Sequence, residues 1–365
     1  MPGGTPSFAR AFSALVMGIA VGGAAACGPG SRESPTAEGA DAGGGGAAAT
    51  CEGGAETVCQ GDAVHACNAD GTVGDMIEAC AGGCWDGTCG GEGGGDQESC
   101  GTEGNDLIYV VDRNYRLLSF DPRALDAGGQ PFTLIGELDC PAGAPWPDWK
   151  GGGSATPFSM SVDREGWAWV LYTSGEIFKV SIEDASCADS GFQRGQEGFE
   201  LFGMGYVSDA QGSDQETLYI AGGSAEQEDI GDLGRVASGS MAVAMVGGLP
   251  DSEYPPELTG TGNGELYAYF PGIFDSWVAR LAKSSADMEQ SWDMNPINGE
   301  PRGWAFAHWG GRFYVFISSQ APFSGIRSQV KVLDPATGSE DVAISNSPYI
   351  VVGAGVSTCA PVVVD

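Results

Sequence analysis

The sequence predicts an all-β protein, and three observations carry this prediction. The chain of 365 residues contains 61 glycines and short runs of Val, Tyr, Trp and Phe, a composition that favours strands and turns. An apolar, aromatic-rich strand pattern recurs at intervals of about fifty residues. Six of the 11 cysteines fall within residues 51–89, a stretch too short for an ordinary hydrophobic core. We therefore expect a small cysteine-rich part and a large repetitive part.

The first element is an export signal over residues 1–26. An apolar run, Ala11 to Val21, follows the single cation Arg10 and leads into small residues ending at Ala26. Such a run is too short to span a bilayer and is typical of a cleaved signal. Cys27 stands directly after it, an arrangement that resembles the lipobox of bacterial lipoproteins. The resemblance implies that Cys27 carries a lipid, and that the protein is exported and anchored to the cell envelope, at the outer membrane.

The next element is a flexible tether over residues 27–50, which lack apolar periodicity. Residues 90–99 form a second linker of the same kind. Between them, residues 51–89 form the cysteine-rich module, with strands expected over 58–60 and 63–67. This module resembles small cysteine-rich repeats of bacterial surface lipoproteins. The sequence leaves open how its six cysteines pair; they are Cys51, Cys59, Cys67, Cys80, Cys84 and Cys89.

The cysteine count favours an oxidising compartment. With Cys27 assigned to lipid, the remaining ten form an even set suited to five disulfides. A zinc site would need Cys-x-x-Cys pairs, whereas the tightest spacing here is Cys80-x-x-x-Cys84-x-x-x-x-Cys89. We therefore expect disulfides, no metal and no cofactor.

The large part, residues 100–365, repeats one strand pattern five times. Its five most apolar strands start 60, 51, 48 and 47 residues apart, and they cover 107–111, 167–171, 218–220, 266–270 and 313–317. Most follow a shorter strand, each precedes a third one, and fourth strands are visible over 132–138, 242–246 and 341–344. A four-stranded unit at this interval is typical of a β-propeller blade. We therefore predict a five-bladed β-propeller.

The first unit lacks its own first strand, because only residues 101–105 precede Leu107. At the other end of the chain, Ile350 to Val356 form a strand that belongs to no unit. We therefore predict that this C-terminal strand completes blade one and closes the ring.

Closure in this way predicts a particular disulfide pattern. Cys100 and Cys359 flank the two chain ends, and a disulfide between them would replace the missing loop, with Cys140 then paired to Cys187. The alternative is a Cys140–Cys359 disulfide, which would leave Cys100 for Cys187 or for the small module.

Three segments of the large part resemble uncharacterised cysteine-rich surface lipoproteins of myxobacteria with a propeller-like C-terminal domain. The segments are Gly353–Pro361, Pro157–Asp163 and Ala185–Cys187. The resemblance implies an envelope location and implies that the module and the propeller belong together. It implies no activity.

Charge and histidine content exclude several functions. The formal net charge of −33 would repel phosphate backbones, so nucleic acid is not an expected partner. Only two histidines are present, and His308 alone lies in the large part, at a strand end where a structural role is expected. No Gly-x-Ser-x-Gly, His-Glu-x-x-His or phosphate-loop motif occurs. Asp163 and Asp209 occupy equivalent turns, where Asp is favoured for local hydrogen bonding.

Binding is the function that the loops favour. Propellers resemble one another in presenting a face built from the loops after strand four and between strands two and three. The aromatic and charged candidates in those loops are Trp146, Trp149, Asp112, Arg113, Tyr115 and Tyr172. We expect a binding module for a carbohydrate or protein ligand, attached to the membrane through its N-terminal lipid.

Two alternatives stay open. A carbohydrate-active enzyme, either a glycoside hydrolase or a lyase, would need two carboxylates roughly 5 to 10 Å apart in the central funnel. A purely structural envelope protein would show a filled, featureless channel.

Overall fold

The computed structural model describes residues 57–59, 63–68, 72–79, 84–85, 88–89, 100, 104–149, 151–224 and 231–363. The expected signal, Cys27, the tether and the 90–99 linker lie outside these residues, as do Cys51 and Cys80. Within the described ranges, no helix has both the length and the apolar character needed to cross a membrane.

The cysteine-rich module contains five short strands. A three-stranded antiparallel sheet is formed by β1 (Thr57–Cys59), β2 (Ala63–Cys67) and β3 (Val73–Ala79), and a two-stranded one by β4 (Cys84–Trp85) and β5 (Thr88–Cys89). The predicted hairpin is confirmed, since Val58 pairs with His65. Cys67 is disulfide-bonded.

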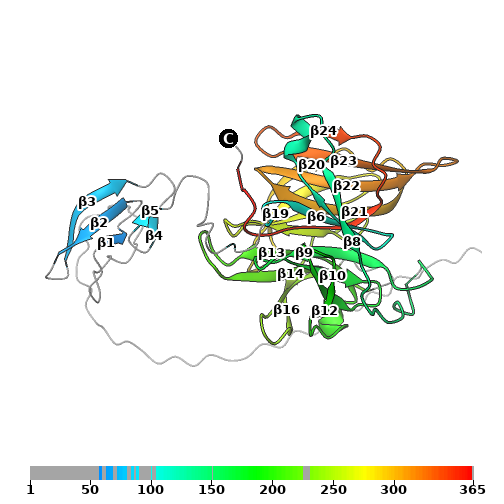
Figure 1. The fold of residues 1–365 in the computed structure, drawn as a ribbon, viewed down its shortest axis with the longest axis horizontal. Helices are drawn as coiled ribbons and strands as arrows, with labels where there is room; N and C mark the ends of the chain where they lie inside the picture. The colour runs from blue at the N-terminus through cyan, green and yellow to red at the C-terminus, as the bar shows by residue number, and fades with distance from the viewer. Residues whose placement is uncertain are drawn as a thin grey trace, which may run out of the picture. The chain divides into compact units, whose positions relative to one another are not determined.

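The remaining strands form five four-stranded antiparallel sheets arranged around one axis, which is the predicted five-bladed propeller (Figure 1). Blade one consists of β25 (Val351–Val356), β6 (Ile108–Asp112), β7 (Arg116–Phe120) and β8 (Phe132–Glu137), from the inner edge outward. A single helical turn, α1 (Arg123–Asp126), joins β7 to β8.

In blades two to five the chain runs from the inner strand outward. Blade two has β9 (Pro157–Val162), β10 (Trp167–Tyr172), β11 (Ile177–Ser181) and β12 (Cys187–Asp189); blade three has β13 (Leu201–Ser208), β14 (Glu216–Gly223), β15 (Asp232–Val236) and β16 (Val243–Gly248). Blade four has β17 (Glu257–Gly260), β18 (Leu266–Phe270), β19 (Ser276–Leu281) and β20 (Met288–Met294); blade five has β21 (Glu300–Trp309), β22 (Arg312–Gln320), β23 (Ile326–Asp334) and β24 (Ser339–Ile344). The 3-10 turn η1 (Gln196–Gly198) connects blades two and three.

The ring closes as the sequence predicts. The C-terminal strand β25 pairs with β6, with Ala354 opposite Val110. Cys100 and Cys359 form a disulfide with a Cα–Cα distance of 5.8 Å across a sequence separation of 259. Cys140 pairs with Cys187, so the predicted pairing is confirmed and the alternative is excluded. We call the Cys100–Cys359 disulfide the clasp.

The inner strands β25, β9, β13, β17 and β21 contact one another in that order around the axis. Two glycines show how closely they approach. A Cβ atom at Gly203 would lie 2.3 Å from the carbonyl oxygen of Pro256, and one at Gly355 would lie 2.8 Å from the backbone of Ser161. The inner strands therefore pack backbone against backbone, and larger apolar side chains fill the spaces between blades.

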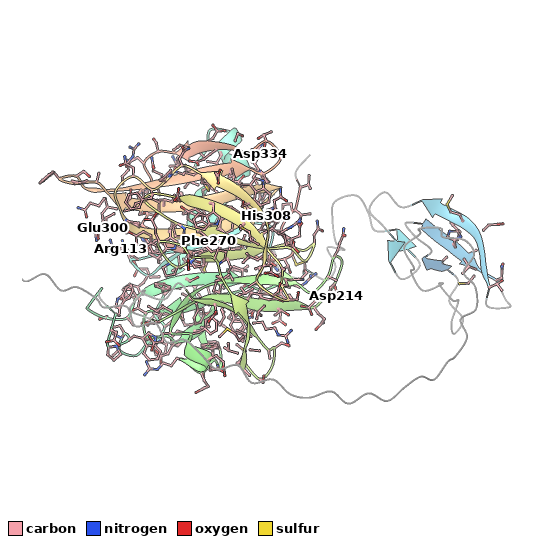
Figure 2. The ribbon with its side chains drawn as sticks, turned by 180° about the vertical axis from the view of Figure 1, so that it is seen from behind. Arg113, Asp214, Phe270, Glu300, His308 and Asp334 are labelled. Atoms are coloured by element: carbon pink, nitrogen blue, oxygen red, sulfur yellow. A yellow bond between two sulfur atoms is a disulfide. The ribbon has the colours of Figure 1, made fainter. Side chains whose placement is uncertain are left out.

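Strand direction gives the ring two different ends. The loops between strands two and three and the connections between blades lie at one end, which we call the pocket end. The remaining loops and the clasp lie at the other, the clasp end. Figure 2 shows Arg113 and Glu300 toward the pocket end and Asp214 toward the clasp end.

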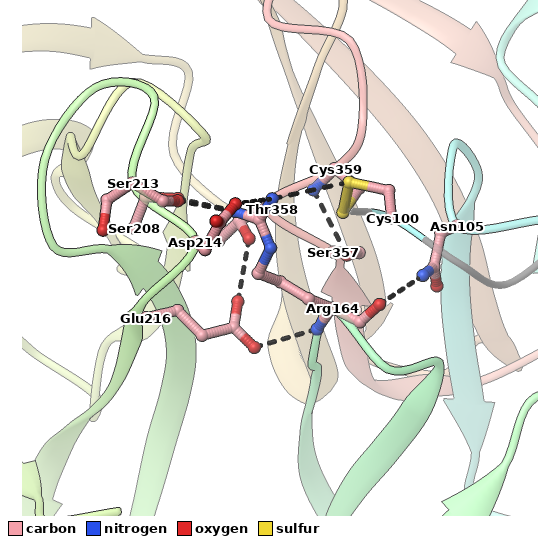
Figure 3. Close-up of a disulfide and its surroundings, with 10 residues drawn as sticks. All are labelled: Cys100, Asn105, Arg164, Ser208, Ser213, Asp214, Glu216, Ser357, Thr358 and Cys359. Atoms are coloured by element: carbon pink, nitrogen blue, oxygen red, sulfur yellow. Dashed lines mark hydrogen bonds and ion pairs between the residues drawn. A yellow bond between two sulfur atoms is a disulfide. The ribbon is translucent and has the colours of Figure 1, made fainter. Parts of the chain in front are cut away.

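A polar network surrounds the clasp (Figure 3). The Arg164 guanidinium donates to the carbonyl of Ser213 at 2.9 Å. The carboxylate of Glu216 accepts bonds from the backbone N–H of Arg164 and from the Thr358 hydroxyl, both at 2.8 Å. Blades two and three are therefore joined to the chain end that carries Cys359.

Two outer strands were not predicted from the sequence. They are β12, which begins at Cys187, and β20. Outer strands pair on one edge only, and most of β20 is exposed, so apolar alternation does not mark it.

Candidate ligand-binding pocket

A pocket of about 540 Å³ opens at the pocket end between blades one and two. Its walls come from the turn after β6, from the long connection after β8 and from the last residue of β10. The residues that line it are Tyr115, Leu138, Asp139, Cys140, Ala142, Gly143, Ala144, Pro145, Gly153, Ser154, Ala155 and Tyr172. The volume is in the range of sites that hold small molecules.

Tyr115 occupies a backbone position that glycine would normally take. Its φ is +62°, and its N–H donates to the carbonyl of Asp112. In the equivalent turn of blade two, Gly175 has a φ of +79° and donates to Tyr172 in the same way. A bulky residue in this conformation costs roughly 1–3 kcal/mol, and such strain gathers at functional sites. The strained turn places the Tyr115 ring in the pocket wall.

Asp112 holds this turn together from inside the protein. Its side chain is fully buried, and its Oδ1 accepts bonds from the backbone N–H of Asn114 at 2.9 Å and of Arg116 at 3.1 Å. Arg116 also pairs with the carboxylate through its guanidinium. Arg113, on the same turn, is exposed. Asp112 therefore positions Tyr115, whose hydroxyl donates to the carbonyl of Ala155 at 2.9 Å.

Tyr172 supplies the most informative polar group of the pocket. Its side chain is only 1 % exposed, and its hydroxyl has no hydrogen-bond partner among the described residues. Burial raises the pKa of Tyr172, and the nearby Tyr115 and Asp139 raise this pKa further. The hydroxyl is therefore neutral and able both to donate and to accept a hydrogen bond.

The loop that forms the outer wall is fixed to blade two. Glu176 accepts hydrogen bonds from the backbone N–H of Gly143 and from the hydroxyl of Ser174, both at 2.7 Å. The hydroxyl of Thr173 accepts a bond from the N–H of Thr156 at 3.0 Å. These bonds hold both ends of the wall, so the pocket is formed before any ligand arrives.

The two tryptophan candidates pack against the ring and are not among the lining residues. The Trp146 indole donates to the carbonyl of Glu200 at 2.9 Å, and the guanidinium of Arg194 lies 4.8 Å from its ring centre. Trp149 packs edge-on against Phe158, with ring centres 5.9 Å apart. Both cover the core between blades two and three. The pocket thus unites Tyr115 and Tyr172 and leaves the tryptophans outside.

Three parts of the pocket were not predicted from the sequence: the Asp139 side chain, the Ala155 carbonyl and the supporting Glu176. Asp139 and Ala155 lie in a long irregular connection that carries no periodic signal. One feature of the sequence could have indicated the pocket. When the turns after β6 and β10 are aligned, Tyr115 takes the position of Gly175, and a tyrosine at a position suited to glycine indicates a functional site.

The inner strands β17 and β21 bury the carboxyl group of Glu257 and the imidazole of His308. Glu257 is 3 % exposed and accepts a 2.8 Å bond from the hydroxyl of Ser159. Burial holds its pKa well above the usual value. His308 stacks on Tyr267, and burial lowers the pKa of its imidazole to about 4. His308 is therefore neutral and packed, as expected.

Two further carboxylates lie toward the clasp end, the buried Asp163 and the partly buried Glu216. Asp163 accepts bonds from the N–H of Trp167 at 2.8 Å and from the indole of Trp169 at 2.7 Å. Burial raises the pKa of Asp163 and raises that of Glu216 to about 7. Neither residue lines the pocket. Among the described residues, no group of three or more His, Cys, Asp or Glu could hold a metal ion.

No protein-family model matches this chain, and no curated protein is similar to it. Several solved structures resemble it in outline. One comes from a nidogen/laminin complex, with a TM-score of 0.39 and 9 % identity, covering 68 % of this chain and 97 % of that one. Another is a protein from Lactobacillus plantarum, with a TM-score of 0.36, 11 % identity and coverage of 84 % and 86 %. A third is an α-L-arabinofuranosidase from Clostridium thermocellum, with a TM-score of 0.37, 12 % identity and coverage of 54 % and 73 %. Likeness at this level assigns neither a family nor an activity to this chain.

Proposed function

We propose that this protein is an exported, lipid-anchored envelope protein whose propeller binds a small ligand at its pocket end. One observation carries the proposal: Tyr172 lines a preformed pocket, and its buried hydroxyl has no hydrogen-bond partner in the part of the chain that the structure describes. A buried hydroxyl without a partner costs roughly 1–3 kcal/mol, which a ligand's polar group would offset.

Export is supported by the disulfides, because such bonds persist in oxidising compartments. The lipid at Cys27 rests on the sequence resemblance. Labelled fatty acid should enter the wild-type protein and not a Cys27→Ser variant, and equal labelling of both would overturn the anchor.

A thermal-shift screen of small molecules against the full-length protein in detergent tests the binding function. Ala144 is an exposed lining residue, and Ala144→Trp would fill the pocket. Ala336→Trp makes the same change at an exposed site at the clasp end. A true ligand should raise the Tm of the wild type and of Ala336→Trp, but not of Ala144→Trp. An equal rise in all three would contradict the proposal.

A glycoside hydrolase is the second candidate, and Glu257 is the observation that bears on it. A protonated carboxyl is the general acid that this chemistry requires, but a second carboxyl must face the same sugar bond. Glu257 is closed in by the inner strands and bonded to Ser159. If the protein hydrolysed a bound glycan and Glu257→Gln abolished this hydrolysis, the protein would be an enzyme rather than a binding module. The absence of any ligand-induced shift would favour the structural alternative.

A further inference from the structure

The chemistry of the pocket narrows the class of ligand. Resting on the proposed function, we propose that the pocket takes an uncharged or amino sugar, or a hydroxylated ring of that size, and discriminates against anionic ligands. Charge, hydrogen bonding and wall chemistry support this assignment independently.

Charge gives the first argument. Among the lining residues that the structure describes, Asp139 is the one acidic residue, and none is a Lys, Arg or His. The carboxylate of Glu176 stands directly behind Gly143 in the same wall. The whole chain carries a formal net charge of −33. A phosphate or carboxylate ligand would therefore meet like charge, with no cation in the described lining to offset it.

Hydrogen bonding gives the second argument. The Tyr172 hydroxyl is neutral and lacks a partner among the described residues, so it suits a ligand hydroxyl, which also donates and accepts. The Asp139 carboxylate can accept from a second hydroxyl or from an ammonium group. An apolar ligand would leave the Tyr172 hydroxyl unpaired.

The walls give the third argument. Leu138, Ala155, Tyr115 and Tyr172 belong to the apolar cluster between blades one and two, while Asp139 and Ser154 bring polar side chains to the same lining. A sugar ring likewise combines apolar C–H faces with a hydroxylated rim. The hydrogen bond from the Tyr115 hydroxyl to Ala155 fixes this ring, so little ordering is needed on binding.

The test uses the full-length protein and two matched charge series. One series is glucose, glucosamine and glucuronic acid, and the other is galactose, galactosamine and galacturonic acid, with binding followed by saturation-transfer NMR and titration. We expect the neutral or amino member to bind at least about fivefold more tightly than the uronic acid, which is the factor for one like charge at 4 Å in water. Preference for a uronic acid would overturn the inference.

Variants then locate the site. Tyr172→Phe removes one hydroxyl and should weaken sugar binding roughly three- to tenfold without loss of stability. Tyr269→Phe is the control, because it also removes a buried tyrosine hydroxyl, but one that lies in blade four, away from the pocket. Equal affinities of Tyr172→Phe and the wild type would overturn the assignment.

The same measurements separate this inference from the proposed function. If no sugar of either series binds, while another small molecule gives a shift that Ala144→Trp abolishes, the sugar class is wrong and the binding function stands. If nothing gives such a shift, both are wrong.

Discussion

The hydroxyl of Ser159 donates a 2.8 Å hydrogen bond to the carboxyl of Glu257, although the two residues belong to blades two and four, which are not neighbours. The strand between them carries Gly203, whose missing side chain leaves room for this contact. The bond therefore passes close to the axis and joins blades that share no sheet edge. It also places a titratable group where water is excluded.

The burial of Glu257 makes stability depend on pH in a defined direction. The pKa of Glu257 is raised in the folded state. The carboxyl therefore gives its full stabilisation of the fold below the ordinary pKa of 4.5, and this stabilisation is lost as the pH rises through the folded-state pKa. Glu257→Gln should remove this pH dependence. Between the two pKa values, its free energy of unfolding should rise relative to that of the wild type by up to about 1.4 kcal/mol per pH unit. Urea unfolding at pH 5, 7 and 9 measures the difference. The exposed Glu183→Gln is the matched control, and parallel pH profiles for Glu257→Gln and the wild type would contradict the account.

The clasp should contribute more stability than the second disulfide. Cys100 and Cys359 are 259 residues apart in the sequence, whereas Cys140 and Cys187 are 47 apart. In the loop-entropy model these bridges contribute about 5.5 and about 4 kcal/mol. Replacing both clasp cysteines with serine should therefore lower the free energy of unfolding by about 1.5 kcal/mol more than the same change at the other pair. A smaller loss at the clasp in urea unfolding would count against ring closure by β25.

Thr358 should control the protonation of Glu216. Its hydroxyl donates to the Glu216 carboxylate and lowers a pKa that burial raises to about 7. Thr358→Val should therefore move the pKa of Glu216 upward. A carbon-13 NMR titration of the Glu216 carboxyl carbon measures the shift. The exposed Thr133→Val should leave it in place, and an unchanged pKa in Thr358→Val would show that this bond does not stabilise the charge.

Glu253 should hold the loop that exposes Phe274. Its carboxylate accepts bonds from the backbone N–H groups of Ile273, Phe274 and Asp275, at 3.1, 2.8 and 3.2 Å. Bonds to a charged acceptor contribute roughly 1.5–3 kcal/mol each, so Glu253→Ala should speed hydrogen exchange at these amides at least about tenfold. Unchanged exchange would show that the loop holds its shape without Glu253. Asp251→Ala, on the same connection, is the control.

The repeated strands and the ring closure were predictable because they depend on local patterns. The second strand of a blade is buried along almost its whole length and therefore reads as a short apolar run, as in β6, β10 and β18. The missing first strand of unit one is visible as the short segment before Leu107. The missing strand predicted that the C-terminal segment, now β25, completes blade one, and this closure in turn predicted the Cys100–Cys359 disulfide. The outer strand β20 left no such mark, because its side chains face solvent and pack against few neighbours.

The pocket was only partly predictable. Tyr115 and Tyr172 were named from their loops, but nothing in the spacing brings Ala155 to the Tyr115 hydroxyl. The two lie 40 residues apart, with β7, α1, β8 and part of an irregular connection between them. Trp146 and Trp149 carried the stronger aromatic signal and yet pack against the ring. Composition identifies aromatic loops, whereas only packing shows which side chains remain available to a ligand.

A crystal structure of the full-length protein with its tightest-binding sugar tests the central claim most directly. The account predicts a sugar hydroxyl within hydrogen-bond distance of the Tyr172 hydroxyl and the sugar ring against Tyr115. A sugar held at Trp146 and Trp149, or beside Glu257, with Tyr172 untouched, would contradict it.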